Sequence, residues 1–202
     1  WLCYDLEVAD FDLTLKVRST RFTKGNSGIQ IRSRYLKDKK KGRWLSGPQI
    51  DLHPRDPFRI GLIYDETKGV NRWIHPSKKN WGISWTDANH IWLWRTLEKD
   101  GGYMENSNAK EPNRMTQVGL TKEEREQGWN VIRIKAQGHK IQTWVNHLPV
   151  ADYDGSKDLT TEMHKKLKVG TTGKIFLQLH AKDDIGMQFK DIKLLKLLPE
   201  KK

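Results

Sequence analysis

The chain has 202 residues, which is enough for one domain with a buried core. Its mean hydropathy is -0.80 and 31% of its residues are charged, but nine tryptophans and many β-branched residues argue against a disordered chain. No apolar run approaches the roughly 18 residues that a membrane-spanning helix needs, and a single cysteine excludes an internal disulfide.

The net charge of +12 raises the question of a nucleic-acid partner. The positive charge is densest between residues 32 and 43, where Tyr35 is the one aromatic residue. Proteins that bind single strands interleave several aromatic side chains with the charge, and no helix-turn-helix motif accompanies it here. We therefore expect a solvated turn in this stretch and no nucleic-acid partner.

Alternation of apolar and polar residues predicts strands along most of the chain. The predicted strands lie at 11–18, 29–32, 49–53, 131–135, 141–146, 177–180 and 189–197. Gly138 is expected to join two of them as a hairpin. Helix signals are few: Thr121 and Glu124 form a capping box, and 160–168 is a second short candidate. This pattern, without an internal repeat, indicates an all-β sandwich.

Residues 71–118 fit the strand pattern least. Five tryptophans lie between 73 and 94, and a polar stretch follows from 98 to 113. Long loops in compact domains are often functional or mobile. We interpret this stretch as a Trp-rich insertion, followed by an exposed loop, within a single domain that spans 1–202.

Six short motifs follow one another along the chain. They are Asn26-Ser27-Gly28-Ile29 with Arg32-Ser33, Gly47-Pro48-Gln49-Ile50-Asp51, Gly61-Leu62-Ile63-Tyr64-Asp65-Glu66, Trp129-Asn130 with Gly138 and Trp144-Val145-Asn146, Gly173-Lys174-Ile175-Phe176-Leu177-Gln178-Leu179-His180, and Phe189-Lys190-Asp191-Ile192. In this order they resemble the 3-keto-disaccharide hydrolase domain family. The resemblance covers about residues 10–198.

The resemblance implies a concanavalin-like jelly roll of two curved antiparallel sheets. It also implies cleavage of glycosides whose sugar carries a 3-keto group, export to the periplasm or the cell exterior, and a partner oxidoreductase that makes the keto sugar. Such domains have a further strand before the segment that corresponds to Asp10-Phe11-Asp12. We therefore expect that a first strand and a signal peptide are missing from this chain. The insertion at 71–118 departs from the shorter members.

Alternation also places polar side chains on shared strand faces. The groups are Gln49, Asp51 and His53 on one strand, Gln30 and Arg32 on a second, and Gln178 and His180 on a third. If these strands are neighbours, a groove in the concave sheet brings together hydrogen-bonding groups that suit a carbohydrate substrate. The residues that we predict to bind this substrate are Arg32, Gln49, Tyr64, Trp73, Trp144 and Gln178, with one of the three aromatic residues as the platform.

The catalytic residues that we predict are Asp51, His180 and Glu66. A 3-keto group makes the hydrogen on C2 acidic, so elimination needs a base, a partner for the enolate oxygen and an acid for the leaving oxygen. Asp51 or His180 is the expected base, and Glu66 the expected acid. Arg32 or a metal is the expected partner of the enolate.

A divalent metal is left open by the sequence. Asp51, His53, Glu66 and His180 offer suitable oxygen and nitrogen ligands, but no helical spacing of such residues indicates a metal site. Glycosidase chemistry with two paired carboxylates is disfavoured, because Asp51 is the one acidic residue on its predicted strand.

A non-catalytic carbohydrate-binding module on the same fold is the main alternative function. The candidate residues also have purely structural interpretations. Asp51 and Arg32 would then form a cross-strand ion pair, and His180 would bond the backbone at a strand end. Trp144 would pack on the surface of its sheet.

Overall fold

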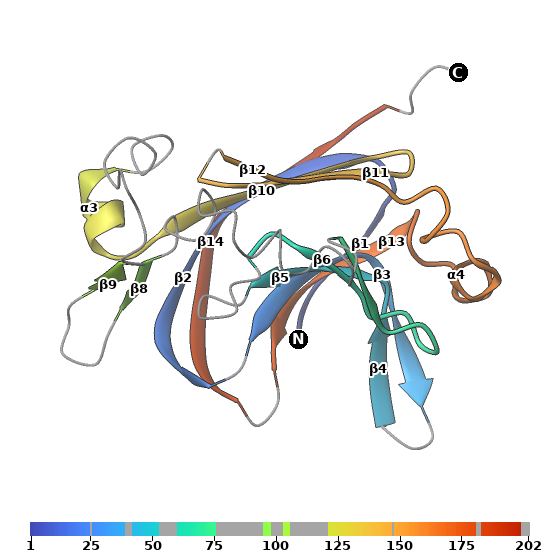
Figure 1. Cartoon of the computed structure of the whole chain (residues 1–202), viewed down its shortest axis with the longest axis horizontal. Helices are drawn as coiled ribbons and strands as arrows, with labels where there is room; N and C mark the ends of the chain where they lie inside the picture. Colours follow the sequence, from blue (N-terminus) through green and yellow to red (C-terminus); the bar gives the residue numbers. More distant parts are fainter. Residues whose placement is uncertain are drawn as a thin grey trace.

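A computed structural model gives the fold of the chain. It describes residues 1–24, 26–38, 42–52, 60–75, 95–97, 103–105, 121–146, 148–180 and 183–198. His53 and most of the predicted insertion at 71–118 lie outside these residues. Within them, two seven-stranded sheets form a sandwich (Figure 1).

Each sheet combines strands that are far apart in the sequence. The first sheet has the order β1 (Leu2–Val8), β13 (Gly173–Leu179), β3 (Ser27–Asp38), β5 (Pro48–Leu52), β6 (Ile63–Asp65) and β7 (Arg72–His75), and β4 (Gly42–Ser46) pairs with β3. The second has the order β12 (Leu148–Asp154), β11 (Lys140–Val145), β10 (Asn130–Gln137), β2 (Phe11–Lys24), β8 (Arg95–Leu97) and β9 (Tyr103–Glu105), and β14 (Asp184–Lys196) pairs with β2. Figure 1 shows β2 in blue beside β14 in red.

The core lies between the sheets and is built by the predicted alternation. Phe11, Leu13, Leu15 and Val17 of β2 are fully or almost fully buried. They belong to one apolar cluster with residues of the first sheet, which include Ile29, Ile31, Ile50 and Leu52. Burying an aliphatic side chain of this size contributes about 1.5–3 kcal/mol. The prediction of an all-β jelly-roll sandwich of two antiparallel sheets is confirmed.

Two short helices, α3 (Lys122–Glu126) and α4 (Glu162–Leu167), complete the described elements. The capping box at α3 forms as predicted: the amide of Glu124 donates to Thr121 Oγ1 (3.1 Å), and the amide of Thr121 donates to Glu124 Oε2 (3.0 Å). Gly138 has a φ of +53° in the hairpin between β10 and β11. Neither helix is long or apolar enough to cross a membrane.

Seven of the described strands were not predicted, and these are β1, β4, β6, β7, β8, β9 and β12. The basic stretch at 32–43 was expected to be a solvated turn, whereas β3 continues to Asp38 and β4 begins at Gly42. Backbone pairing of Arg34 with Ser46 and of Leu36 with Trp44 forms this ladder. Lys37 pairs with Arg43 in the same ladder, so basic residues do not prevent the pairing of these two strands.

Candidate functional site

The first sheet carries polar side chains on the face opposite its core residues. In the strand register, Gln30 of β3 pairs with Gln49 of β5, and Gln49 pairs with Tyr64 of β6. Gly28 pairs with Asp51 on one side and with Gln178 on the other. Directly paired residues lie on the same face of a sheet. The structure thus brings together side chains that the sequence placed on three separate strands.

We call these residues, with the adjoining Glu66, the polar cluster. Its members are Gln30, Gln49, Asp51, Tyr64, Glu66 and Gln178. Four of them are only 0–4% exposed, whereas Tyr64 and Glu66 are partly exposed. The Oε1 atoms of all three glutamines are buried, and no donor among the described residues forms a hydrogen bond with them. A buried acceptor left in this way costs about 1–3 kcal/mol, so the three oxygens fit a ligand rich in hydroxyl donors.

Gly28 provides the space that Gln49 occupies. A Cβ atom at position 28 would lie 2.5 Å from Cδ of Gln49, which is closer than any non-bonded carbon contact allows. The side chain of Gln49 therefore lies across the backbone of β3. A larger residue at position 28 would displace this amide from the polar cluster.

Glu66 is the member of the polar cluster with a strongly raised pKa. Burial, the largest cause, and the nearby carboxylates of Asp51 and Asp65 together raise its pKa to about 7. A hydrogen bond from Gln30 Nε2 to Glu66 Oε2 opposes this rise. The carboxyl group can therefore hold a proton near neutral pH, as a general acid must.

A buried pair supports the strand end that carries Glu66. Nε2 of His164, on α4, lies 3.1 Å from Oδ2 of Asp65, and its Nδ1 lies 2.7 Å from Oγ1 of Thr161. The other oxygen of Asp65 accepts from the amide of Thr67 (3.0 Å). Sequence reasoning did not identify His164. Its only signal was a histidine in a short predicted helix, which gives no partner.

His180 lies at the rim, beyond the end of β13. Its Nδ1 is 2.7 Å from Asp183 Oδ2, and its side chain is 52% exposed. The amide of Asn26 donates to the same oxygen of Asp183 (3.2 Å), and Asn26 Nδ2 donates to Asp51 Oδ1 (3.2 Å). These contacts join the exposed histidine to the buried carboxylate. Asn26 and Asp183 were missed as site residues, although Asn26 opens the first of the six motifs.

Arg32 does not belong to the polar cluster, which corrects the expectation that it shares a face with Gln30. Its φ of +47° marks an irregularity in β3, and its side chain is fully buried on the other side of the sheet. The guanidinium donates to the carbonyl of Ala9 (2.7 Å), the carbonyl of Gly138 (2.8 Å) and Asp10 Oδ1 (3.0 Å). The expected cross-strand ion pair of Arg32 is therefore made with Asp10 instead of Asp51.

The three aromatic residues predicted as platforms lie in different parts of the fold. Trp144 lies on β11 in the second sheet, with the guanidinium of Arg133 4.7 Å from its ring centroid, so it is remote from the polar cluster. Trp73 is paired with Tyr64 through the backbone, and its side chain is outside the described part of the structure. Tyr64 remains the platform candidate within the polar cluster.

Comparison with known proteins assigns the chain to a family. The model of the 3-keto-alpha-glucoside-1,2-lyase-like domain matches residues 1–195. The chain belongs to this family. No curated protein matches the chain.

Solved structures similar to this family member include two provisionally assigned glycosyl hydrolases from Parabacteroides distasonis ATCC 8503. The first has a TM-score of 0.47 and 15% identity, and the match covers 96% of this chain and 75% of that one. The second has a TM-score of 0.41 and 19% identity, with coverages of 96% and 82%. A carbohydrate-binding module, CBM66 from Bacillus subtilis, has a TM-score of 0.44 and 13% identity, with coverages of 94% and 77%.

Three of the four metal ligands proposed from the sequence lie among the described residues of this family member. Among the described residues, no group of three or more His, Cys, Asp or Glu side chains is arranged to hold a metal ion. His53, one of the proposed ligands, lies outside the described residues. The chemistry that the described residues support is proton exchange with a ligand by two carboxyl groups and hydrogen bonding by three amides.

Proposed function

We propose that the chain cleaves glycosides of 3-keto sugars and that the polar cluster is its active site. The observation that carries this proposal is that the polar cluster holds two carboxyl groups, the buried Asp51 and Glu66, whose pKa is raised to about 7. A carboxyl group that keeps its proton near neutral pH, in a site with a second carboxyl group, is a common arrangement for one acid and one base. The family match over residues 1–195 supports the substrate class.

The reaction follows from the acidity of the hydrogen on C2. A base removes this proton, and the electron pair moves onto the C3 oxygen as an enolate. When the carbonyl group re-forms, a double bond develops between C1 and C2 and the bond from C1 to the glycosidic oxygen breaks. The leaving oxygen takes up a proton from an acid. Addition of water across the double bond then completes the hydrolysis.

Asp51 is the proposed base and Glu66 the proposed acid. The row of Gln30, Gln49 and Tyr64 lies between them, two residues or about 7 Å along the strands from each. A sugar ring over this row would have one carboxyl group at each end. Near neutral pH, a Glu66 with a pKa of about 7 still carries a proton in a large fraction of molecules.

His180 is proposed to position the base. It is half exposed and lies two residues beyond Gln178, so it is further from the row than Asp51 is. Its contact with Asp183, and that of Asn26 with Asp51, connect it to the carboxylate. With Arg32 bound elsewhere, the amides of Gln49 and Gln178 are the proposed donors to the enolate oxygen.

Release of p-nitrophenol from p-nitrophenyl 3-keto-β-glucoside tests the activity. We expect Asp51→Asn and Glu66→Gln each to lower kcat by about 10²–10⁴-fold, the usual contribution of a general acid or base. Asp152→Asn is the matched control, because Asp152 is exposed on β12 and pairs with Lys140. Unchanged turnover in both Asp51→Asn and His180→Ala would contradict the assignment of the base.

Deuterium exchange separates the base from the acid. A 3-keto-1,5-anhydroglucitol has no leaving group on C1, so its C2 hydrogen can exchange with D₂O without cleavage. We expect exchange to persist in Glu66→Gln and to stop in Asp51→Asn. Loss of exchange in Glu66→Gln alone would reverse the two roles.

Two further measurements address the alternatives. Turnover that stops with EDTA and returns with a divalent cation would show that a metal takes part. Saturable binding of ordinary oligosaccharides without cleavage of any 3-keto-glycoside would favour a carbohydrate-binding module.

We also propose that the protein is exported and that an oxidoreductase supplies its substrate. A 3-keto sugar arises by oxidation of the C3 hydroxyl group of an ordinary sugar, which is the reaction of an oxidoreductase. Fractionation of the source cells with an antibody tests the location. Recovery in the cytoplasmic fraction would contradict export.

A further inference from the structure

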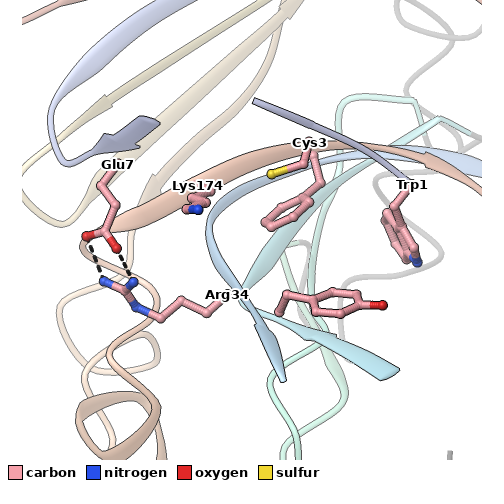
Figure 2. Close-up of a pocket in the computed structure, with 7 residues that line it drawn as sticks. Trp1, Cys3, Glu7, Arg34 and Lys174 are labelled. Carbon is pink, nitrogen blue, oxygen red and sulfur yellow. Dashed lines mark hydrogen bonds and ion pairs between the residues drawn. The ribbon is translucent and has the colours of Figure 1, made fainter. Parts of the chain in front are cut away.

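The cations at the edge of the first sheet are neutralised. A cavity of about 670 Å³ lies at this edge, and Figure 2 shows Arg34 facing Glu7 on its wall, with Lys174 nearby. Arg34 binds both oxygens of Glu7 through its two terminal nitrogens, and Lys174 Nζ lies 2.5 Å from Asp5 Oδ1. Each of these two cations has a carboxylate partner, so the cavity does not account for the net charge of +12.

Unbalanced positive charge lies on the outer face of the second sheet, where β10, β2 and β14 are neighbours (Figure 1). In the strand register, Lys16 of β2 pairs with Lys190 of β14. Thr14 pairs with Arg133 of β10 on one side and with Lys193 of β14 on the other. We call the central part of this surface the basic face. Its cations are Lys16, Arg18, Arg133, Lys135, Lys190 and Lys193.

Two of these cations share one carboxylate. Glu124 Oε1, on α3, lies 2.8 Å from Lys16 Nζ and 2.7 Å from Lys190 Nζ. Asp191 Oδ2 also lies 3.0 Å from Lys16 Nζ. The carboxylates of this part of the basic face therefore match the two lysines without any excess of negative charge.

The rest of the basic face has more cations than carboxylates. Asp12 accepts hydrogen bonds from Arg133 with both of its oxygens, although its register partner is Lys135. Among the described residues, Lys135 and Lys193 have no carboxylate partner. Six cations against the three carboxylates of Asp12, Glu124 and Asp191 leave an excess of three positive charges. Such an excess attracts an anionic partner.

Two indole rings hold three of the cations in place. The guanidinium of Arg18 lies 4.7 Å from the ring centroid of Trp129, and Lys190 Nζ lies 4.4 Å from it. Arg133 lies over the ring of Trp144 at 4.7 Å. Cations fixed in this way lose less side-chain entropy when an anion binds, which favours binding.

The same contacts favour a partner without bases. Proteins that bind single-stranded nucleic acids stack the bases on open aromatic rings. Trp129 is only 7% exposed and has two cations over its ring, and the ring of Trp144 is covered by Arg133. Neighbouring strands repeat at about 4.8 Å, so a polymer with charged groups at short intervals can contact several cations at once.

We propose that the basic face binds an anionic polysaccharide through the carboxylate or sulfate groups of successive sugars. This inference goes beyond the proposed function, because the basic face and the polar cluster lie on the outer faces of different sheets. Both surfaces can be occupied at once. Binding would hold the protein on an anionic polymer and leave the polar cluster accessible.

Dissociation constants for heparin and for polygalacturonate at low salt test the proposal, with uncharged dextran for comparison. Lys135→Gln combined with Lys193→Gln should weaken binding by roughly tenfold, which corresponds to the loss of two exposed charge contacts. Lys37→Gln combined with Lys166→Gln is the matched control. It removes the same charge from exposed positions on β3 and α4, outside the basic face, and should change binding by less than about twofold.

Binding should also disappear in 1 M salt, where the Debye length falls to about 3 Å. A preference for heparin or for polygalacturonate supports the proposal and distinguishes sulfate from carboxylate groups. Equal losses in the two double variants would overturn it, because net charge alone would then attract the polymer. Failure of the wild-type protein to bind either anionic polysaccharide would overturn it as well. Tighter binding of single-stranded DNA than of both polysaccharides would show that the partner is a nucleic acid instead.

Discussion

The buried guanidinium of Arg32 lies 3.0 Å from Asp10 Oδ1 and joins β3 to the residues that precede β2. Two carbonyls, those of Ala9 and Gly138, accept its other hydrogen bonds. Arg32 therefore connects the first sheet to two segments of the second. Burial, opposed in part by Asp10, lowers its pKa to about 10, so the side chain is charged at neutral pH.

Replacing Arg32 by methionine should destabilise the protein by about 3 kcal/mol, because the largely buried Asp10 would lose its charged partner and keep only the hydrogen bond from the amide of Gly138. Urea denaturation measures this loss. The kcat per folded molecule should stay within about twofold of the wild-type value, an estimate that follows if Arg32 touches no substrate. A large loss of kcat in a stably folded Arg32→Met protein would show that Arg32 takes part in the reaction.

The strand face of Arg32 could not be predicted from the sequence. Alternation correctly predicted the strand faces of β2, β5, β10 and β11, because those strands keep a period of two. It failed at Arg32 because a positive φ shifts the side chain to the other face. Gly173 has a φ of +146°, and a Cβ there would lie 2.5 Å from the carbonyl carbon of Arg32. This close approach of β13 to β3 has no signal in a single sequence.

Glu66→Gln should stabilise the protein at alkaline pH. With a folded pKa of about 7 and an ordinary value of 4.5, the folded state binds more protons than the unfolded state between these values. The free energy of unfolding therefore falls as pH rises from 4.5 to 7, by at most about 3 kcal/mol. The variant should be more stable than the wild type at pH 8 and similar at pH 4.

Denaturation at both pH values, with Glu123→Gln as the exposed control, measures this effect. A stability difference that does not depend on pH would show that Glu66 is not the titrating group. The turnover rate should depend on the same titration of Glu66. As pH rises through about 7, kcat should fall, because the proposed acid loses its proton.

Gly28→Ala should impair activity more than stability. The added Cβ would meet the end of the Gln49 side chain, which can move, so β3 itself is preserved. Displacing this amide by about 1 Å should lower kcat/KM by roughly tenfold to a hundredfold. Gly138→Ala is the contrasting variant, because its φ of +53° makes the added Cβ cost about 1–2 kcal/mol of stability. Equal losses of activity in both variants would contradict a specific role for Gln49.

The candidate site was partly predictable for a related reason. Gln49, Asp51 and Gln178 could be assigned to strand faces, and the structure places those faces side by side. Asn26, Asp183 and His164 contact the site from loops and a helix, where no periodicity fixes a direction. The strand β1 was not predicted either, although Cys3, Asp5 and Glu7 alternate with Leu2, Tyr4 and Leu6.

Glu124→Gln should loosen α3 from the second sheet. Glu124 Oε1 lies 2.8 Å from Lys16 Nζ and 2.7 Å from Lys190 Nζ, and these contacts lower the pKa of the carboxyl group to about 2. A lowered pKa stabilises the fold above about pH 4.5, and the effect is lost as pH falls toward 2. Because the group is near the surface, we expect a loss of only about 1 kcal/mol at pH 7, reduced further by salt.

Thermal denaturation of Glu124→Gln and of the neighbouring Glu123→Gln measures this difference. Glu123 accepts a hydrogen bond from Gln127 (2.8 Å) within the same short segment, so its substitution controls for a change of charge in the helix. The gap between the two variants should close at pH 2 and in 1 M salt. A gap that persists under both conditions would mean that packing, and not the ion pairs with Lys16 and Lys190, attaches α3 to the sheet.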